Sequence, residues 1–484
     1  MISKTARSCV FACLFGAGTA HAQAPTVQDL QNRLQQFEES AQKQITELKK
    51  QIAALQPGQN PPSAVPTTTA TPQTEVPTVT TPVEYYGTET RTRQTAGENE
   101  VGAPRIDNEP LDPELLGFFH LPGTSAYMKF GGFVKTDLLY DLNYAGSYYG
   151  AYVPSSFPSS TTPHSENSTV SMRPTRFTWE TRQGTLDNSG SEVKAYFEFD
   201  FFSNYDRNSI RLRQFYGQYK NFLAGQAWSA FSDPDAFPDT LEFEGPPGII
   251  AARNPQFRYT QPLNKHNSIG VSVEKTGVDT PFNTALGVPI GTSKFPDLIG
   301  FYRFENNRGH LHAAALFRNV GGTVPNEEVL DLGRHTAGYG MSLSGTWGLW
   351  KKDNLVFQLV FGKGISNYYN DNFGLGTDVG FNATGKLVAT PTGSGQFGYT
   401  HSWTKMVRST VSYGYLQINS PAADPGTTYH ISNYATANLM IQPTVRYMFG
   451  AEYIYGSLER KDDFKWIAPR IQASVIYYIN KYPR

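Results

Sequence analysis

The feature that most constrains the fold is a regular alternation of apolar and charged side chains from Tyr127 to the C-terminus. In its first stretch Phe130 and Leu138 share one face, while Lys135 and Asp137 share the other. Successive side chains of a β-strand point to opposite faces, so this pattern predicts strands with one apolar and one charged face. Such strands suit a wall between lipid and a watery lumen.

The alternation returns in later stretches, which are separated by turns of two kinds. A tight turn is predicted at 442–444, whereas 145–169 and 278–296 are long and rich in Gly, Ser and Pro. Short turns on one rim and long loops on the other are typical of outer-membrane β-barrels, and even parity favours sixteen strands over eighteen. The outward side chains of three later stretches are predicted to be Val193, Ala195, Phe197, Phe199 and Phe201, then Leu311, Ala313, Ala315 and Phe317, then Leu355, Phe357, Leu359 and Phe361.

Composition agrees with an all-β membrane protein. Aromatic residues make up 13% of the 484 residues and there are 44 Gly, yet the mean hydropathy is only -0.42. No apolar run of about 18 residues follows the N-terminus, which excludes a helical membrane protein. We therefore expect a transmembrane antiparallel β-barrel over 126–484, because alternating strands average to a low hydropathy.

A secretory signal peptide is predicted for residues 1–22. Lys4 and Arg7 precede an apolar stretch, and the small-residue site Ala20-His21-Ala22 predicts cleavage before Gln23. An uncleaved membrane anchor is the alternative. Both cysteines of the chain lie inside this signal, so the mature chain can form neither disulfides nor thiolate metal sites.

Two further segments are predicted before the barrel. Residues 23–56 should form a periplasmic coiled-coil helix, with a lone amphipathic helix as the alternative. Residues 57–125 begin with a Pro/Thr-rich linker, predicted to be disordered, and continue as an irregular segment. The apolar seam of the helix consists of Val27, Leu30, Leu34, Phe37, Ala41, Ile45, Leu48, Ile52 and Leu55.

Three segments carry a resemblance to a known family. Ala224-Gly225-Gln226-Ala227-Trp228-Ser229, the loop 232–246 and the late stretch 450–456 resemble the DcaP-like porin family, as does the order of coiled coil, spacer and barrel. The resemblance implies a homotrimeric, sixteen-stranded diffusion channel for small anionic solutes such as dicarboxylates. The barrel pattern and the export signal predict an outer-membrane location in contact with lipid and lipopolysaccharide, with the N-terminal segment in the periplasm, and we expect no cofactor, metal or nucleic acid.

The loop after Trp228 is strongly acidic. A diffusion channel needs fixed charges at a narrow point, and the resemblance would fold this loop into the lumen as a constriction loop. A solvated surface loop is the alternative. The acidic residues are Asp233, Asp235, Asp239, Glu242 and Glu244.

Inward-pointing arginines are predicted opposite that loop. Guanidinium groups bind carboxylates bidentately, which suits an anion-selective pore. For any single one of them, an ordinary lumen arginine paired with a neighbouring acid is the alternative. The 41 Lys and Arg nearly balance the 42 Asp and Glu, so selectivity must come from local geometry. Alternation places Arg176, Arg182, Arg211, Arg213 and Arg258 on the inner face.

Other classes of function find less support in the sequence. The string Gly393-Ser394-Gly395-Gln396-Phe397-Gly398 matches a dinucleotide-binding pattern, but it leads into an alternating strand and predicts only a turn. His310 and His312 share one strand face without an evident third metal ligand, which favours lumen lining. We therefore expect no enzyme. A structural tether, whose coiled coil binds a periplasmic or cell-wall partner, remains the alternative to a channel.

Overall fold

The computed structural model describes residues 46, 50, 117–146, 151–158, 165–184, 192–202, 209–275, 277–278, 290–323, 334–350, 353–384, 386–422 and 424–479. The chain divides into two units, Met1–Pro82 and Val83–Arg484, and all described strands belong to the second. The predicted signal peptide and most of the predicted coiled coil and linker lie outside the described residues. No helix in the described part of the chain is long and apolar enough to cross a membrane.

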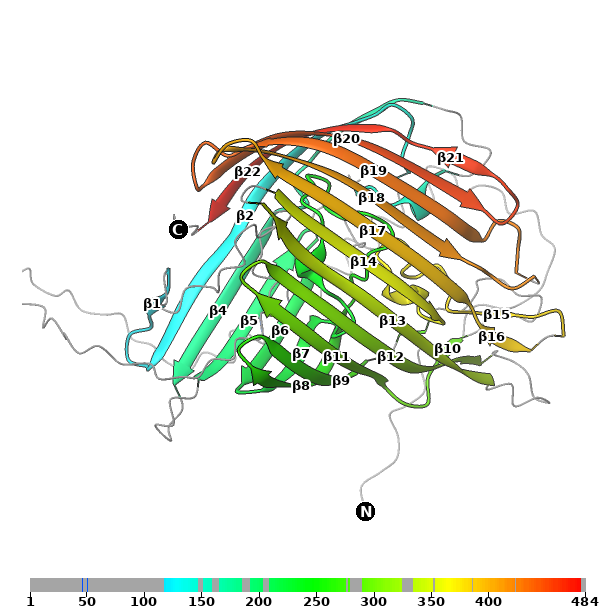
Figure 1. Cartoon of the computed structure of the whole chain (residues 1–484), viewed down its shortest axis with the longest axis horizontal. Helices are drawn as coiled ribbons and strands as arrows, with labels where there is room; N and C mark the ends of the chain where they lie inside the picture. The colour runs from blue at the N-terminus through cyan, green and yellow to red at the C-terminus, as the bar shows by residue number, and fades with distance from the viewer. Residues whose placement is uncertain are drawn as a thin grey trace, which may run out of the picture. The chain divides into compact units, whose positions relative to one another are not determined.

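The described strands form a closed antiparallel barrel, as predicted, with sixteen positions in its wall. The barrel closes where β2 pairs with β22, with Gly132 opposite Ile479 (Figure 1). The wall consists of β2 (Ala126–Asp141), β3 (Asn167–Ser171) together with β4 (Arg176–Gly184), β5 (Glu192–Asp200), β6 (Arg211–Tyr219), β7 (Phe222–Trp228), β8 (Arg253–Asn264), β9 (Asn267–Glu274), β11 (Asp297–Asn306), β12 (Gly309–Thr323), β13 (Arg334–Leu349), β14 (Asp353–Lys363), β17 (Pro391–Ser402), β18 (Val407–Ile418), β19 (Tyr429–Ile441), β20 (Tyr447–Arg460) and β22 (Arg470–Ile479).

Short strands extend this wall or stand apart from it. Within the barrel sheet, β1 (Phe119–His120) pairs with β2, β10 (Ile290–Thr292) with β12, and β21 (Lys465–Ile467) with β20. A separate hairpin joins β15 (Val379–Phe381) to β16 (Leu387–Ala389).

The alternation orients side chains as predicted. On β2, Phe130 and Leu138 are exposed on the outside of the barrel, whereas Lys135 and Asp137 are buried inside. On β12, Leu311 and Phe317 are likewise exposed. The apolar face therefore lies outside, and the charged face lines the lumen.

One local prediction was wrong. Residues 393–398, predicted to be a turn, lie within β17 and pair with both β14 and β18. Gly398 faces the lumen, where an added Cβ would lie 2.8 Å from Cβ of Pro238. Gly398 therefore reflects close packing against a loop inside the barrel rather than a change of chain direction.

Loops of two lengths join the strands. Residues 220–221 and 265–266 make tight connections, whereas 229–252 and 364–390 are long. We call residues 229–252, which join β7 to β8 and contain the 3-10 turn η2 (Pro234–Ala236), the inner loop. Its backbone contacts side chains on the luminal face of the wall.

Candidate functional site

The inner loop is hydrogen-bonded to several strands of the luminal wall. Its backbone carbonyls accept hydrogen bonds from inward side chains: Gln396 Nε2 to Ala236 at 2.7 Å, Asn438 Nδ2 to Asp239 at 2.8 Å, and Gln472 Nε2 to Leu241 at 3.0 Å. Lys135 Nζ on β2 also donates to Leu241 O. Since the donors come from β17, β19, β22 and β2, the loop lies along that side of the barrel.

The first two acidic residues of the loop are held by the wall. Asp233 is 1% exposed, and its carboxylate accepts from Ser344 Oγ at 2.7 Å and lies 2.8 Å from His310 Nε2. Arg303 bridges Asp233 at 3.3 Å and Asp235 at 2.8 Å. Burial alone would raise the pKa of Asp233, but His310 and Arg303 hold that pKa well below its usual range.

The remaining acids differ in their surroundings. Asp239 is buried and pairs with Arg408 on β18 at 2.6 Å. Glu242 is also buried, where it accepts from the backbone N–H groups of Tyr152 at 3.2 Å and Gly245 at 2.7 Å. Burial, with repulsion from nearby acid, raises the pKa of Glu242 to about 8. Among the predicted acids, Asp235 and Glu244 are the two that keep partial exposure.

A cluster of arginines lies on the wall beside the inner loop. On β4 and β6, the guanidinium groups of Arg176, Arg211 and Arg213 lie 5.4, 5.8 and 5.4 Å from the ring centre of Phe243, at the far end of the inner loop. Such cation–π contacts hold cations beside an apolar ring without neutralising them. The structure therefore brings three of the predicted arginines together beside the inner loop.

Two strand carboxylates balance part of this charge. Asp200 pairs with Arg211 at 2.7 Å and with Arg213 at 2.9 Å, and Glu198 lies 3.7 Å from Arg176. Arg253, which the sequence reasoning did not single out, stacks over Trp228 at 4.8 Å and has no carboxylate partner among the described residues. Four guanidinium groups against two carboxylates leave an excess of two positive charges. We call Arg176, Arg211, Arg213 and Arg253 the arginine wall.

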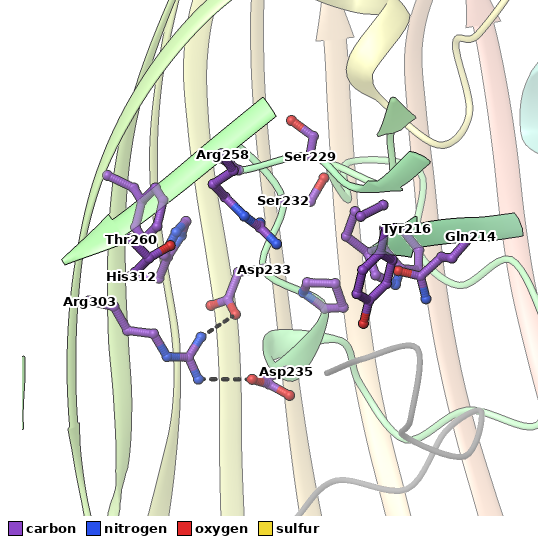
Figure 2. A pocket seen from close by; sticks show the side chains of 15 residues that line it. Gln214, Tyr216, Ser229, Ser232, Asp233, Asp235, Arg258, Thr260, Arg303 and His312 are labelled. Carbon is purple, nitrogen blue, oxygen red and sulfur yellow. Dashed lines mark hydrogen bonds and ion pairs between the residues drawn. The ribbon is translucent and has the colours of Figure 1, made fainter. Parts of the chain in front are cut away.

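The two other predicted arginines lie apart from this cluster. Arg182 pairs with Glu180 on the same strand at 2.6 Å. Arg258 lines a small pocket, partly open to solvent, that also contains Asp233, Asp235 and Arg303 (Figure 2). Arg258 Nε has no hydrogen-bond partner within the described residues.

Asp233 and Asp235 of this pocket also form, together with His310, a group of possible metal ligands. One oxygen each of Asp233 and Asp235 and one ring nitrogen of His310 lie within 4.8 Å of one another. Arg303 donates to both carboxylates, however, so the place of a bound cation is taken by a side chain of the protein. His312 lines the same pocket, in keeping with the lumen-lining position expected for it.

Comparison with known proteins gives a consistent picture. The family model described as DcaP outer membrane protein matches residues 122–478. The outer membrane channel DcaP of Acinetobacter baumannii has a similar fold, with a TM-score of 0.64 and 22% identity over 75% of this chain and 100% of that chain. An anion-selective porin from Comamonas acidovorans is more distant, with a TM-score of 0.47 and 10% identity over 73% and 100% of the two chains. No curated protein sequence matches this chain.

Proposed function

Since the chain belongs to the DcaP outer membrane protein family, we propose that it is a passive diffusion channel of the outer membrane for small hydrophilic anions such as dicarboxylates. The similarly folded Acinetobacter protein is named as an outer membrane channel. The proposal includes a homotrimer, with lipid and lipopolysaccharide around the exposed apolar face of each barrel.

The anion preference is supported by an imbalance of charge across the lumen. Asp233, Asp235 and Asp239 are paired with wall cations. The arginine wall keeps an excess of two positive charges by the count given above. At physiological ionic strength charges are screened over about 8 Å, so a solute at the constriction feels the nearest groups most. Within the arginine wall the uncompensated groups are guanidiniums, which bind carboxylates bidentately.

Passage also requires weak contacts, because a tightly bound solute would block the channel. Arg211 and Arg213 already share Asp200, so a passing carboxylate competes with a carboxylate of the protein. Arg253 instead offers a guanidinium that stacks on Trp228 and forms no ion pair among the described residues. We therefore assign the main attractive contact to Arg253, with the partly exposed Arg211 as a weaker neighbouring contact; Arg213 is buried and contributes through its charge.

The experiment is the reversal potential in a salt gradient across a planar bilayer. The wild type should select anions, and Arg253→Gln should bring the anion-to-cation permeability ratio closer to one. Arg308→Gln is the matched control, because Arg308 is exposed on the short turn between β11 and β12. Arg211→Ala with Arg213→Ala is less informative, since it would leave Asp200 buried and unpaired. A cation-selective wild type would overturn the proposal.

A further inference from the structure

A second segment lies beside the inner loop within the barrel. Residues 364–378, which we call the return segment, leave β14 and include the 3-10 turn η3 (Ser366–Tyr368). Ile365 is completely buried and Tyr369 is 1% exposed. They belong to a buried cluster that includes Phe231 of the inner loop and Leu416 on the inward face of β18. The return segment therefore fills luminal space next to the inner loop.

The two segments are joined through their backbones. Ile250 and Tyr369 form an isolated antiparallel bridge. Ala251 N donates to Tyr368 O at 3.1 Å, and Asn370 N donates to Ile249 O at 2.9 Å. These two hydrogen bonds join residues 249–251 of the inner loop to residues 368–370 of the return segment as a short antiparallel pair. We call this pair the clasp.

The clasp is stabilised by the side chain of Asn370 and by hydrogen bonds from the return segment to the wall. Asn370 Nδ2 donates to Glu244 O at 2.6 Å. Tyr368 Oη donates to Asp297 on β11 at 2.7 Å, while Arg318 on β12 donates to Gly364 O at 2.8 Å. Both ends of the η3 turn are thus fixed to inward groups of the wall.

The middle of the return segment is hydrogen-bonded to a third loop and to β19. The carboxylate of Asp371 accepts hydrogen bonds from Ser155 N at 2.8 Å, Tyr429 Oη at 2.8 Å and Ser432 Oγ at 3.1 Å. Ser155 belongs to the loop after β2, whereas Tyr429 and Ser432 belong to β19. Asp371 is itself buried, so these bonds are shielded from water.

From this geometry we propose that the return segment is the second half of the constriction and sets the size limit of the channel. The inference rests on the proposed channel function and deepens it. The ion pairs of Asp233 and Asp239 with wall arginines hold the first half of the inner loop. The clasp holds the half from Glu244 to Ala251. Solutes pass in the space left toward the arginine wall, so the clasp determines width while the arginines determine charge preference.

Asn370→Pro tests the clasp with one substitution. Proline removes the donor to Ile249 O and the side-chain donor to Glu244 O together. The preceding Tyr369 has φ -76° and ψ 142°, an extended conformation that the residue before proline prefers. Single-channel conductance and the exclusion limit for neutral sugars in liposome swelling should both increase, with the anion preference retained.

Asn307→Ala, in the exposed short turn between β11 and β12, serves as the control and should leave both values unchanged. If the wild type conducts but Asn370→Pro leaves the conductance and the exclusion limit unchanged or lowers them, the inference is overturned. The channel proposal would then still stand. A folded wild type that does not conduct would overturn both. Heat-dependent gel mobility establishes that each barrel is folded.

A disulfide across the clasp provides a second measurement in case Asn370→Pro fails to fold. Ile250 and Tyr369 are a non-hydrogen-bonded antiparallel pair, and the Cα separation of about 4.5 Å typical of such pairs suits a disulfide. The predicted mature chain has no cysteine to compete. In Ile250→Cys with Tyr369→Cys, reduction should raise the conductance and oxidation should lower it. Equal conductance in both states, with the disulfide verified, would contradict a clasp that controls the width.

Discussion

At the scale of single residues, the acids of the inner loop act first as anchors. Asp233 lies in the same buried network as Arg303 and His310, which come from β11 and β12. A buried ion pair contributes little beyond an apolar contact of the same shape, but losing one partner leaves a buried charge without compensation. Asp233 and Asp239 therefore fix the position of the loop strongly, and their own negative charges are neutralised by the wall.

Asp233→Ala should lower the free energy of unfolding by roughly 3 kcal/mol, because it strips a buried carboxylate from Arg303 and His310. The measurement is urea unfolding of the barrel in detergent micelles. Asp462→Ala is the control, since Asp462 pairs with Arg460 near the surface and should change stability little. Equal effects of the two substitutions would contradict the anchoring role.

Sequence reasoning identified the inward arginines but not their partners. Alternation with period two decides which face a side chain takes, so the inner position of Arg176 or Arg213 follows from local sequence alone. The partner of Asp239 is Arg408, which is 169 residues away. Alternation could place Arg408 on the inner face but could not bring it to this loop, because that depends on how the loop folds back into the barrel. Arg253 was missed since it begins a strand, where alternation has no preceding residues.

At the scale of elements, the inner loop is shaped to lie against glycines of the wall. Gly414 on β18 faces Pro246, and Gly450 on β20 faces Leu241, where an added Cβ would lie 2.7 Å from the leucine side chain. A Cβ at either position would push the loop toward the arginine wall. These strand glycines therefore set how far the loop stands from the wall. In the sequence they were only counted, and no packing role was predicted for them.

The return segment gives the clasp a pH dependence. Burial raises the pKa of Asp371 to about 6, above the value of about 3.9 expected in an unfolded chain. A carboxyl whose folded pKa is raised binds its proton more tightly in the folded state, so the clasp gains stability as pH falls from about 6 to about 4. At pH 7 the ionised carboxylate holds its three partners at a cost in desolvation.

Asp371→Asn should remove that dependence. In the wild type, the opening fluctuations of single-channel current should become rarer between pH 7 and pH 5, whereas in Asp371→Asn they should stay constant over this range. Glu242, with its pKa raised to about 8, is mostly protonated throughout this range and contributes little to the change. Wild-type fluctuations that increase on acidification would contradict the assigned direction.

At the scale of the whole molecule, the barrel satisfies its own backbone. Every wall strand pairs with two neighbours, and β2 closes against β22. A closed barrel leaves no sheet edge exposed, so its stability does not require the N-terminal segments. The exposed outer side chains, among them Phe215, Phe257 and Met341, form an apolar surface that can contact lipid or a second barrel. This surface makes the wall the expected site of association.

Removal of residues 23–83 from the mature protein should therefore leave a folded oligomer of barrels. The predicted coiled coil over 23–56 would add stability by raising the effective concentration of neighbouring barrels, without supplying the main contact. Native mass measurement in detergent should give the same number of subunits with and without the segment, and a lower dissociation temperature without it.

The matched control is the full-length protein with Leu34, Leu48 and Leu55 changed to Asp, which should dissociate at the same lower temperature as the truncated protein. Truncation that yields only monomers would place the main contact in the N-terminal segment and would favour the tether hypothesis over association through the walls.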